Sequence, residues 1–248
     1  MKFEDYKFMQ LGGNCAWLAM IDRQKRIRGP MDNTILFGVN GIKLLIEDKF
    51  YDFIRTKKFE KKKRPPGHFN GDYDYFSTFP DNTVRYVHNE PKGEHFLKNL
   101  KQRCNNFNDF LKKVKTNPHY YLVITLNQEM LEWQTGKIKN NNKLFDIIKY
   151  LNKINLLNKV IFIGCKVVSI DFNCFDYYLK ENDILKIKKQ FPDFYYIEIT
   201  DVNVWDQTHA EEEFKEKILK IITKIEADLK EKENKDTTYL GYKLWGLY

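Results

Sequence analysis

Apolar and polar positions alternate in regular blocks along the second half of the chain. Near-continuous apolar runs are typical of strands buried on both faces, and such runs occur at 120–126, 159–164 and 194–199. Apolar residues also recur at helical spacing over 145–154, 183–190 and 214–229. Strands that alternate with helices at these lengths predict an α/β fold with a central, mostly parallel sheet flanked by helices.

The first half carries the same signals with wider gaps between them. A strand is predicted at 6–11, a helix at 15–26, a second helical stretch at 42–54 and an amphipathic helix at 96–114. Charged residues, Pro, Gly, Asn and Asp dominate 57–82, which predicts a long irregular insertion. An insertion of this length inside a compact domain is often a functional rim or lid.

Length and composition favour one domain with a C-terminal extension. The chain has 248 residues, and we assign 1–230 to a single α/β domain. Residues 231–248 form a tail, first charged and then aromatic, which either docks back on the core or serves as a homodimer arm. No apolar run is long enough to span a membrane, and Glu4 and Asp5 stand where a signal peptide carries basic residues. We therefore expect a cytoplasmic protein.

The formal charge of +8 comes mainly from lysines spread through the chain. The one dense cluster, 57–64, runs into Pro65 and is typical of a solvated loop, so nucleic-acid binding is not favoured. The four cysteines lie far apart, which predicts reduced thiols, and the five histidines show no metal-ligand spacing. Neither a Gly-x-Gly-x-x-Gly motif nor a Gly-Lys-Ser/Thr loop is present, so we expect no cofactor and no metal.

The turn after the first predicted strand carries the strongest candidate for chemistry. Gly12 and Gly13 predict the turn, and Cys15 falls on the first turn of the helix that follows. A thiol there lies at the positive end of the helix dipole, near unpaired backbone N–H groups, and both favour the nucleophilic thiolate. A small cysteine after a Gly-Gly turn is also ordinary packing, so a structural role for Cys15 stays open.

The first 115 residues contain short blocks in a fixed order: Leu11-Gly12-Gly13-Asn14-Cys15, Gly29-Pro30-Met31-Asp32-Asn33, Leu44 to Phe53, Tyr86-Val87-His88-Asn89-Glu90, and a helix with Arg103, Phe107 and Phe110. This order resembles a bacterial domain family of unknown function that is labelled papain-like cysteine peptidase. Met31 and Asn33 stand where the family has aromatic residues, whereas Asp32 is kept.

The resemblance implies a cysteine nucleophile and a histidine base, and it leaves the substrate open as a peptide or a small molecule. Papain-like folds also carry an antiparallel sheet, whereas the periodicity of this chain predicts a parallel one. We take the fold from the periodicity and the choice of residues from the resemblance.

Cysteine catalysis requires a thiolate, a base, an orienting group and donors for the oxyanion. Cys15 supplies the sulfur, and its N–H can hold the oxyanion together with the Asn14 side chain or the Gly13 N–H. Gln10 is a further candidate donor by resemblance to the glutamine of papain-like enzymes, although it lies inside the predicted strand.

The favoured base is His88, which falls in the family-like block at the end of a short predicted strand, 83–88. Asn89, Glu90 or Asp32 would orient its imidazole. A polar residue at a strand end, exposed to water, is the plain alternative for His88.

A second histidine competes for the role of base. Asp206 and His209 lie between the predicted strand at 194–199 and the last helix. This Asp-x-x-His placement resembles the acid–base pair of SGNH-type esterases, whose nucleophile also follows the first strand, with Cys15 in place of the serine. Thr208 and Glu211 also fit a capping box, which is the structural alternative.

The sequence thus predicts a cysteine-dependent hydrolase or acyl transferase with Cys15 as nucleophile and a histidine as base. A non-catalytic α/β module that binds a ligand at the carboxyl edge of the sheet is the alternative from a different class.

Overall fold

The computed structural model describes the backbone of residues 2–12, 29–30, 34–36, 38–56, 59–63, 73–77, 84–86, 93–126, 132–134, 137–140, 142–166, 178–200 and 208–244. Side chains are described for a smaller set, namely 2–12, 29–30, 38–56, 93–126, 143–166, 178–200 and 212–232.

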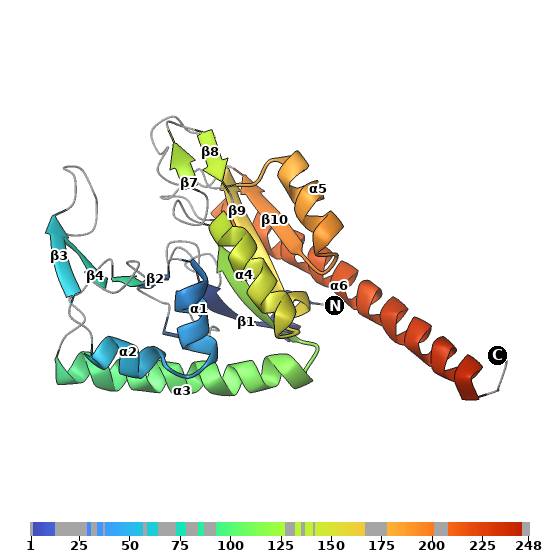
Figure 1. Cartoon of the computed structure of the whole chain (residues 1–248), viewed down its shortest axis with the longest axis horizontal. Helices are drawn as coiled ribbons and strands as arrows, with labels where there is room; N and C mark the ends of the chain where they lie inside the picture. Colours follow the sequence, from blue (N-terminus) through green and yellow to red (C-terminus); the bar gives the residue numbers. More distant parts are fainter. Residues whose placement is uncertain are drawn as a thin grey trace.

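Four parallel strands form the central sheet (Figure 1). They are β1 (Lys7–Gly12), β6 (Tyr120–Thr125), β9 (Val160–Lys166) and β10 (Tyr195–Thr200), and they lie side by side in that order. Each neighbouring pair is parallel. The predicted α/β fold with a parallel sheet is therefore confirmed. The strands are almost entirely apolar because both of their faces are covered.

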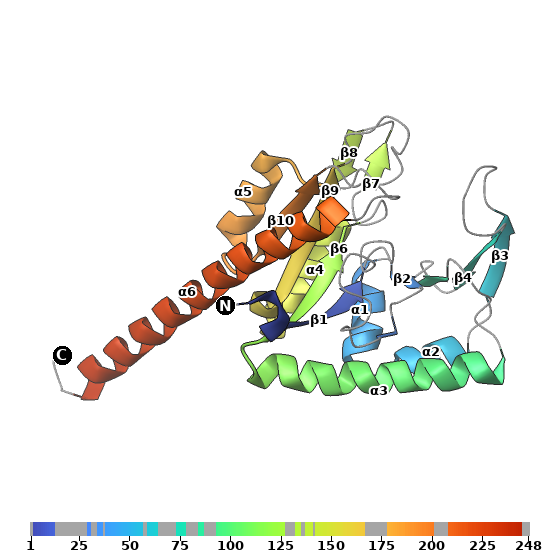
Figure 2. The same ribbon diagram turned by 180° about the vertical axis from the view of Figure 1, so that it is seen from behind.

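Helices cover the two faces of the sheet unequally. The connections between strands contribute α1 (Gly38–Ile46), α2 (Phe50–Thr56), α3 (Glu94–Thr116), α4 (Asn142–Lys153) and α5 (Glu181–Gln190). The opposite face carries α6 (Thr208–Leu244), which crosses the front of the sheet in Figure 2. Two short 3-10 turns, Phe3–Asp5 and Leu157–Lys159, precede β1 and β9. No helix in the described part of the chain combines the length and apolarity that a membrane span requires.

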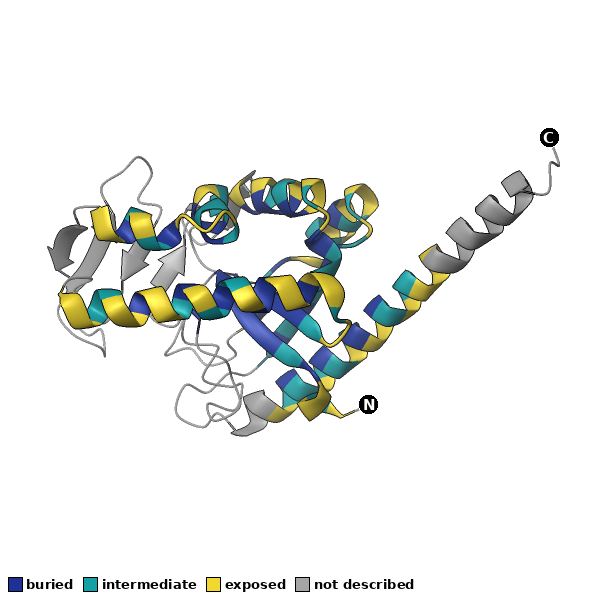
Figure 3. Cartoon of the chain, turned by 90° about the horizontal axis from the view of Figure 1, so that it is seen from below, coloured by how far each residue is buried: buried dark blue, intermediate teal, exposed yellow. Residues whose placement is uncertain are grey.

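The core divides into two clusters, one on each face of the sheet. Along β6, Leu122 and Ile124 face the cluster shared with α1 to α5, whereas Tyr121 and Val123 face the cluster shared with α6. Alternate residues of a strand point to opposite faces, so each strand contributes to both clusters. The buried stripe of α3 turns toward the sheet and its charged residues turn outward (Figure 3).

A second, antiparallel sheet lies beyond the carboxyl end of β1 (Figures 1 and 2). Its strands are β2 (Thr34–Leu36), β5 (Val84–Tyr86), β4 (Tyr73–Ser77) and β3 (Phe59–Lys63), in that order. The stretch 57–82, predicted as irregular, therefore contains two paired strands. Their composition concealed them, because β3 holds three lysines and a glutamate and has no alternation of apolar residues. A small hairpin, β7 (Glu132–Gln134) and β8 (Lys137–Asn140), was not predicted either.

Two helical predictions differ from the structure in their limits. The stretch 42–54 is divided between α1 and α2 by a turn in which Asp48 has a positive φ of 58°. Asp tolerates this left-handed conformation, and it ends a helix much as Gly or Asn does. The last helix is longer than predicted, since α6 continues to Leu244, into the stretch assigned to the tail.

Hydrogen bonds on both flanks fix α6 on the sheet. The Tyr6 hydroxyl donates to Glu226 Oε1 (3.0 Å), and the Tyr195 hydroxyl donates to Asp228 Oδ2 (2.9 Å). Burial, followed by the hydrogen bond to Glu226, raises the pKa of Tyr6 to about 12. Tyr121 lies on β6 between these two tyrosines, is 0% exposed, and has no hydrogen-bond partner for its hydroxyl among the described residues. The hydroxyl groups of the three tyrosines therefore differ in what they contribute to the stability of the fold.

We predict that Tyr121→Phe leaves the free energy of unfolding unchanged or raises it by up to about 1 kcal/mol, because an unpaired buried hydroxyl is costly. The matched variant Tyr195→Phe should lose about 1–2 kcal/mol, since it removes a hydrogen bond to a carboxylate. Urea denaturation of both variants measures the difference. An equal loss in both would show that the Tyr121 hydroxyl has a partner.

Candidate functional site at the carboxyl edge of the sheet

The last residues of β1 depart from regular pairing just before the turn that leads to Cys15. Gln10 pairs with Val123 and Gly12 pairs with Ile124, so Leu11 is an extra residue and forms a β-bulge. Bulges redirect the chain at the end of a strand and are common beside functional sites. The carboxyl end of β1 is therefore the first place to look for a site.

A buried polar pair lies at this bulge. The Gln10 amide Nε2 donates to the Gly12 carbonyl (3.2 Å) and to Thr125 Oγ1 on β6 (3.4 Å). Gln10 is 3% exposed and Thr125 is 2% exposed, and apart from tyrosines they are the only polar residues in the described core. By resemblance, Gln10 is a candidate oxyanion donor, and its described contacts are those to the Gly12 carbonyl and to Thr125.

The chain returns to β1 at Gly29. A Cβ atom built on Gly29 would lie 3.3 Å from both Cγ and Sδ of Met9, so this glycine packs directly on the strand. Gly29 and Pro30 are both buried. Gly12 and Gly29, the described residues on either side of 13–28, thus both lie at β1, whereas the stretch itself, with Asn14 and Cys15, lies outside the described residues.

The antiparallel ladder of β2 and β5 is adjacent in sequence to two other candidates. Thr34 pairs with Tyr86 at the end of this ladder. Asp32 precedes Thr34 by two residues and His88 follows Tyr86 by two residues. Both lie outside the described residues, but the chain leaves the same end of the ladder toward each of them.

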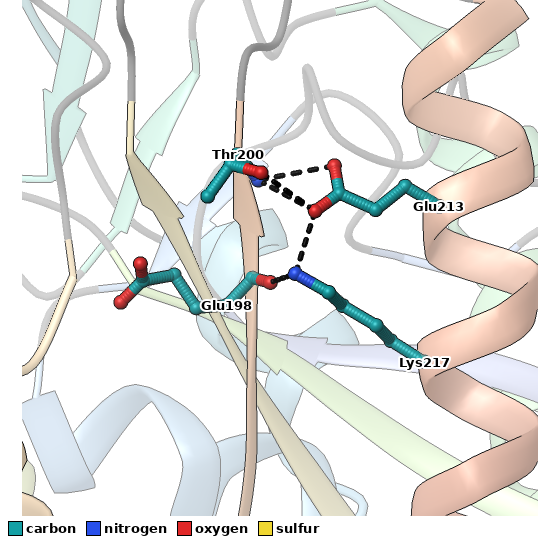
Figure 4. Close-up of polar contacts among 4 residues, drawn as sticks. All are labelled: Glu198, Thr200, Glu213 and Lys217. Atoms are coloured by element: carbon teal, nitrogen blue, oxygen red, sulfur yellow. Dashed lines mark hydrogen bonds and ion pairs between the residues drawn. The ribbon is translucent and has the colours of Figure 1, made fainter.

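The carboxyl end of β10 is held by a different set of contacts (Figure 4). The Glu213 carboxylate accepts hydrogen bonds from the Thr200 N–H (3.1 and 3.2 Å) and hydroxyl (2.7 Å) and pairs with the Lys217 ammonium. Lys217 also donates to the Glu198 carbonyl. Burial raises the pKa of Glu213, but the hydrogen bonds from Lys217 and Thr200 outweigh it and leave this pKa below its usual range.

These contacts place the start of α6 on the side of β10. Asp206 lies outside the described residues, and His209 is described only as backbone within α6, one helical turn before Glu213. Because β6 and β9 separate β10 from β1, the two strands are three spacings apart, about 14 Å. The described backbone therefore starts α6, with His209, near the carboxyl end of β10, which is the edge strand opposite β1.

The two described cysteines, Cys104 and Cys165, are buried and form no disulfide. Burial, and to a lesser extent the charge of Asp48, raises the pKa of the Cys104 thiol to about 12. A thiol with so high a pKa is not a nucleophile near neutral pH. The described residues also contain no group of three His, Cys, Asp or Glu side chains able to hold a metal ion.

Thr125 is the site residue that the sequence pattern missed. It is the one non-aromatic polar residue in the apolar run 120–126, and it stands at the carboxyl end of that strand. A lone hydroxyl at this position in a parallel strand is a signal that could have found it.

Comparison of the chain with models of known protein families, with curated proteins and with solved structures gave no match.

We predict that Glu213→Gln lowers the free energy of unfolding by about 1–2 kcal/mol at pH 7. A carboxylate with a lowered pKa in the folded state stabilises above its unfolded pKa, about 4.3, and loses this effect as the pH falls through the folded value. The difference from the unmodified protein should therefore shrink at pH 3.5. Urea denaturation at both values tests this.

Glu216→Gln is the matched control, because Glu216 is exposed on the same helix. It should change stability little at either pH. A loss in Glu213→Gln that persists undiminished at pH 3.5 would contradict the assignment of the stabilising group.

Proposed function

We propose that this protein is a cysteine-dependent hydrolase or acyl transferase, with Cys15 as nucleophile, His88 as base and Asp32 as its orienting acid. The observation that supports the proposal is the pairing of Thr34 with Tyr86. The chain leaves the ladder at this end both toward Asp32 and toward His88. If this antiparallel register continues by two residues, positions 32 and 88 are opposite each other.

The topology of the central sheet supports a site built by the segment after β1. Its strands follow one another in chain order, and the helices that connect them pack on one face. Such a sheet lacks the reversal of strand order that opens a ligand crevice in doubly wound folds. The chain between β1 and α3 forms the second sheet, and in this proposal that part of the chain supplies the walls of the site.

The proposed reaction is acyl transfer through a thioester. His88 takes the thiol proton of Cys15, and the thiolate attacks the carbonyl carbon of an ester, thioester or amide. The backbone N–H of Cys15 and the Asn14 side chain stabilise the oxyanion. His88 then donates its proton to the leaving group, and water or a second acceptor resolves the thioester. The substrate is a peptide or a small molecule, and a reduced thiol suits the expected cytoplasmic setting.

His209 with Asp206 is the second candidate base. The contacts of Glu213 hold the start of α6 beside β10, across the sheet from β1. A base must lie within hydrogen-bond reach of the sulfur, and the family resemblance gives this role to the histidine of the block 86–90. We therefore propose His88 as the base.

We predict that Cys15 has a thiol pKa at least one unit below the ordinary value of about 8.5, and that His88→Ala raises it whereas His209→Ala does not. An imidazolium beside the sulfur stabilises the thiolate, and its removal cancels that effect. The measurement is the pH dependence of iodoacetamide labelling, read by mass spectrometry on the Cys15 peptide.

Cys104 provides an internal reference in the same molecule, because its high pKa predicts very slow labelling of the folded protein. Asp32→Asn should give an intermediate pKa for Cys15. A pKa that rises only in His209→Ala would assign the base to the Asp206 pair. An ordinary pKa for Cys15 in the unmodified protein would overturn the catalytic proposal and leave a ligand-binding module.

A further inference from the structure

We propose that Gln10 and Thr125 form a positioning pair that fixes the backbone of the turn carrying Cys15. The inference rests on the proposed function, because it assigns to this pair an effect on the Cys15 thiol. Neither side chain is a catalytic residue here, since each acts through the backbone between β1 and Cys15.

The first support is the β-bulge at Leu11. An extra residue disrupts the ladder between β1 and β6 at the point where Gly12 leaves it. The Gln10 amide reaches over the bulge to the Gly12 carbonyl (3.2 Å). The side chain thus fixes the carbonyl of the last residue of β1, three residues before Cys15.

The second support is the burial of the pair. An amide and a hydroxyl at 3% and 2% exposure are costly to bury without hydrogen bonds, and apolar residues of the same size would fill the same space without that cost. The described side chains of β1 and β6 around them are otherwise apolar or aromatic apart from Lys7 at the strand start. The two polar residues occur together, on neighbouring strands, at the carboxyl edge where the proposed site begins.

The third support is the length of the link. At most about 11 Å of chain separates Gly12 from Cys15, so Cys15 cannot lie far from the backbone that the pair fixes. A nucleophile held 1 Å from its productive position loses much of its rate. The Thr125 hydroxyl oxygen, on the neighbouring strand, accepts a hydrogen bond from the Gln10 amide (3.4 Å) and thereby fixes the position of that amide.

The test compares Thr125→Val and Gln10→Met, which keep side-chain volume and remove the hydrogen bonds. Thr125→Ser restores the hydroxyl. Ile124→Val is the matched control, because Ile124 is equally buried on the same strand and faces the opposite side of the sheet. The readout is the rate of iodoacetamide labelling of Cys15 from pH 5 to 9, with circular dichroism to confirm folding.

We expect labelling at pH 6 to fall about tenfold in Thr125→Val and in Gln10→Met, which corresponds to a thiol pKa raised by one unit. Thr125→Ser and Ile124→Val should stay within about twofold of the unmodified protein. If the unmodified protein shows a lowered Cys15 pKa and both polar variants retain it, the positioning role is wrong and the proposed function stands.

An equal shift in Ile124→Val would also overturn the inference, because general loosening of the core would then explain the effect. An ordinary Cys15 pKa in the unmodified protein would instead reject the proposed function itself. If Gln10→Met fails to fold, the pair of Thr125 variants still decides, since a valine replaces threonine with almost no change of shape.

Discussion

The order of the four parallel strands is the constraint on which the rest of the structure depends. Each strand follows its neighbour in the chain, and right-handed crossovers place all connecting helices on the same face. The opposite face is left to a single helix, α6. Its buried stripe of Phe214, Ile218, Ile222 and Ile225 covers the apolar residues that β6, β9 and β10 present there. At about 1.5–3 kcal/mol for each buried side chain, this stripe is a large share of the stability of a domain.

Side chains of α6 protect one outer edge of the sheet. At β10, the Lys217 ammonium donates to the Glu198 carbonyl and the Glu213 carboxylate accepts from the Thr200 N–H, so two charged side chains occupy backbone groups at the carboxyl end of this edge strand. An open edge strand invites pairing with another chain, and charged side chains are a common protection. At the other edge strand, β1, Gly29 packs on the Met9 side chain.

The elements that the sequence predicts well are those whose environment is uniform along their length. The strands at 120–126 and 159–164 are apolar or aromatic at nearly every position because helices cover both faces of the sheet, and this pattern can be recognised in the sequence alone. The strand β3 lacks such a pattern, since backbone pairing with β4 forms it and its lysines carry no periodicity.

The candidate site was predictable only in part, for a related reason. Local signals, namely a strand, two glycines and a helix start, predict the Cys15 turn, which lies outside the described residues. The bulge at Leu11 depends on the register between β1 and β6, which no local pattern encodes. The contact of Gln10 with Thr125 joins residues 115 positions apart in the chain. Long-range pairs of this kind appear only when the fold is known.

The buried Cys104 illustrates why a reactive cysteine is expected outside the regular core. Burial among apolar side chains raises the pKa of the Cys104 thiol to about 12, so the packing that stabilises the domain also keeps this thiol protonated and unreactive. A nucleophilic cysteine needs backbone N–H groups and a cationic partner, which the two-sided apolar sheet does not offer within its strands. Such groups are found where strands end, and the only non-aromatic polar pair in the described core, Gln10 with Thr125, lies at the carboxyl ends of β1 and β6.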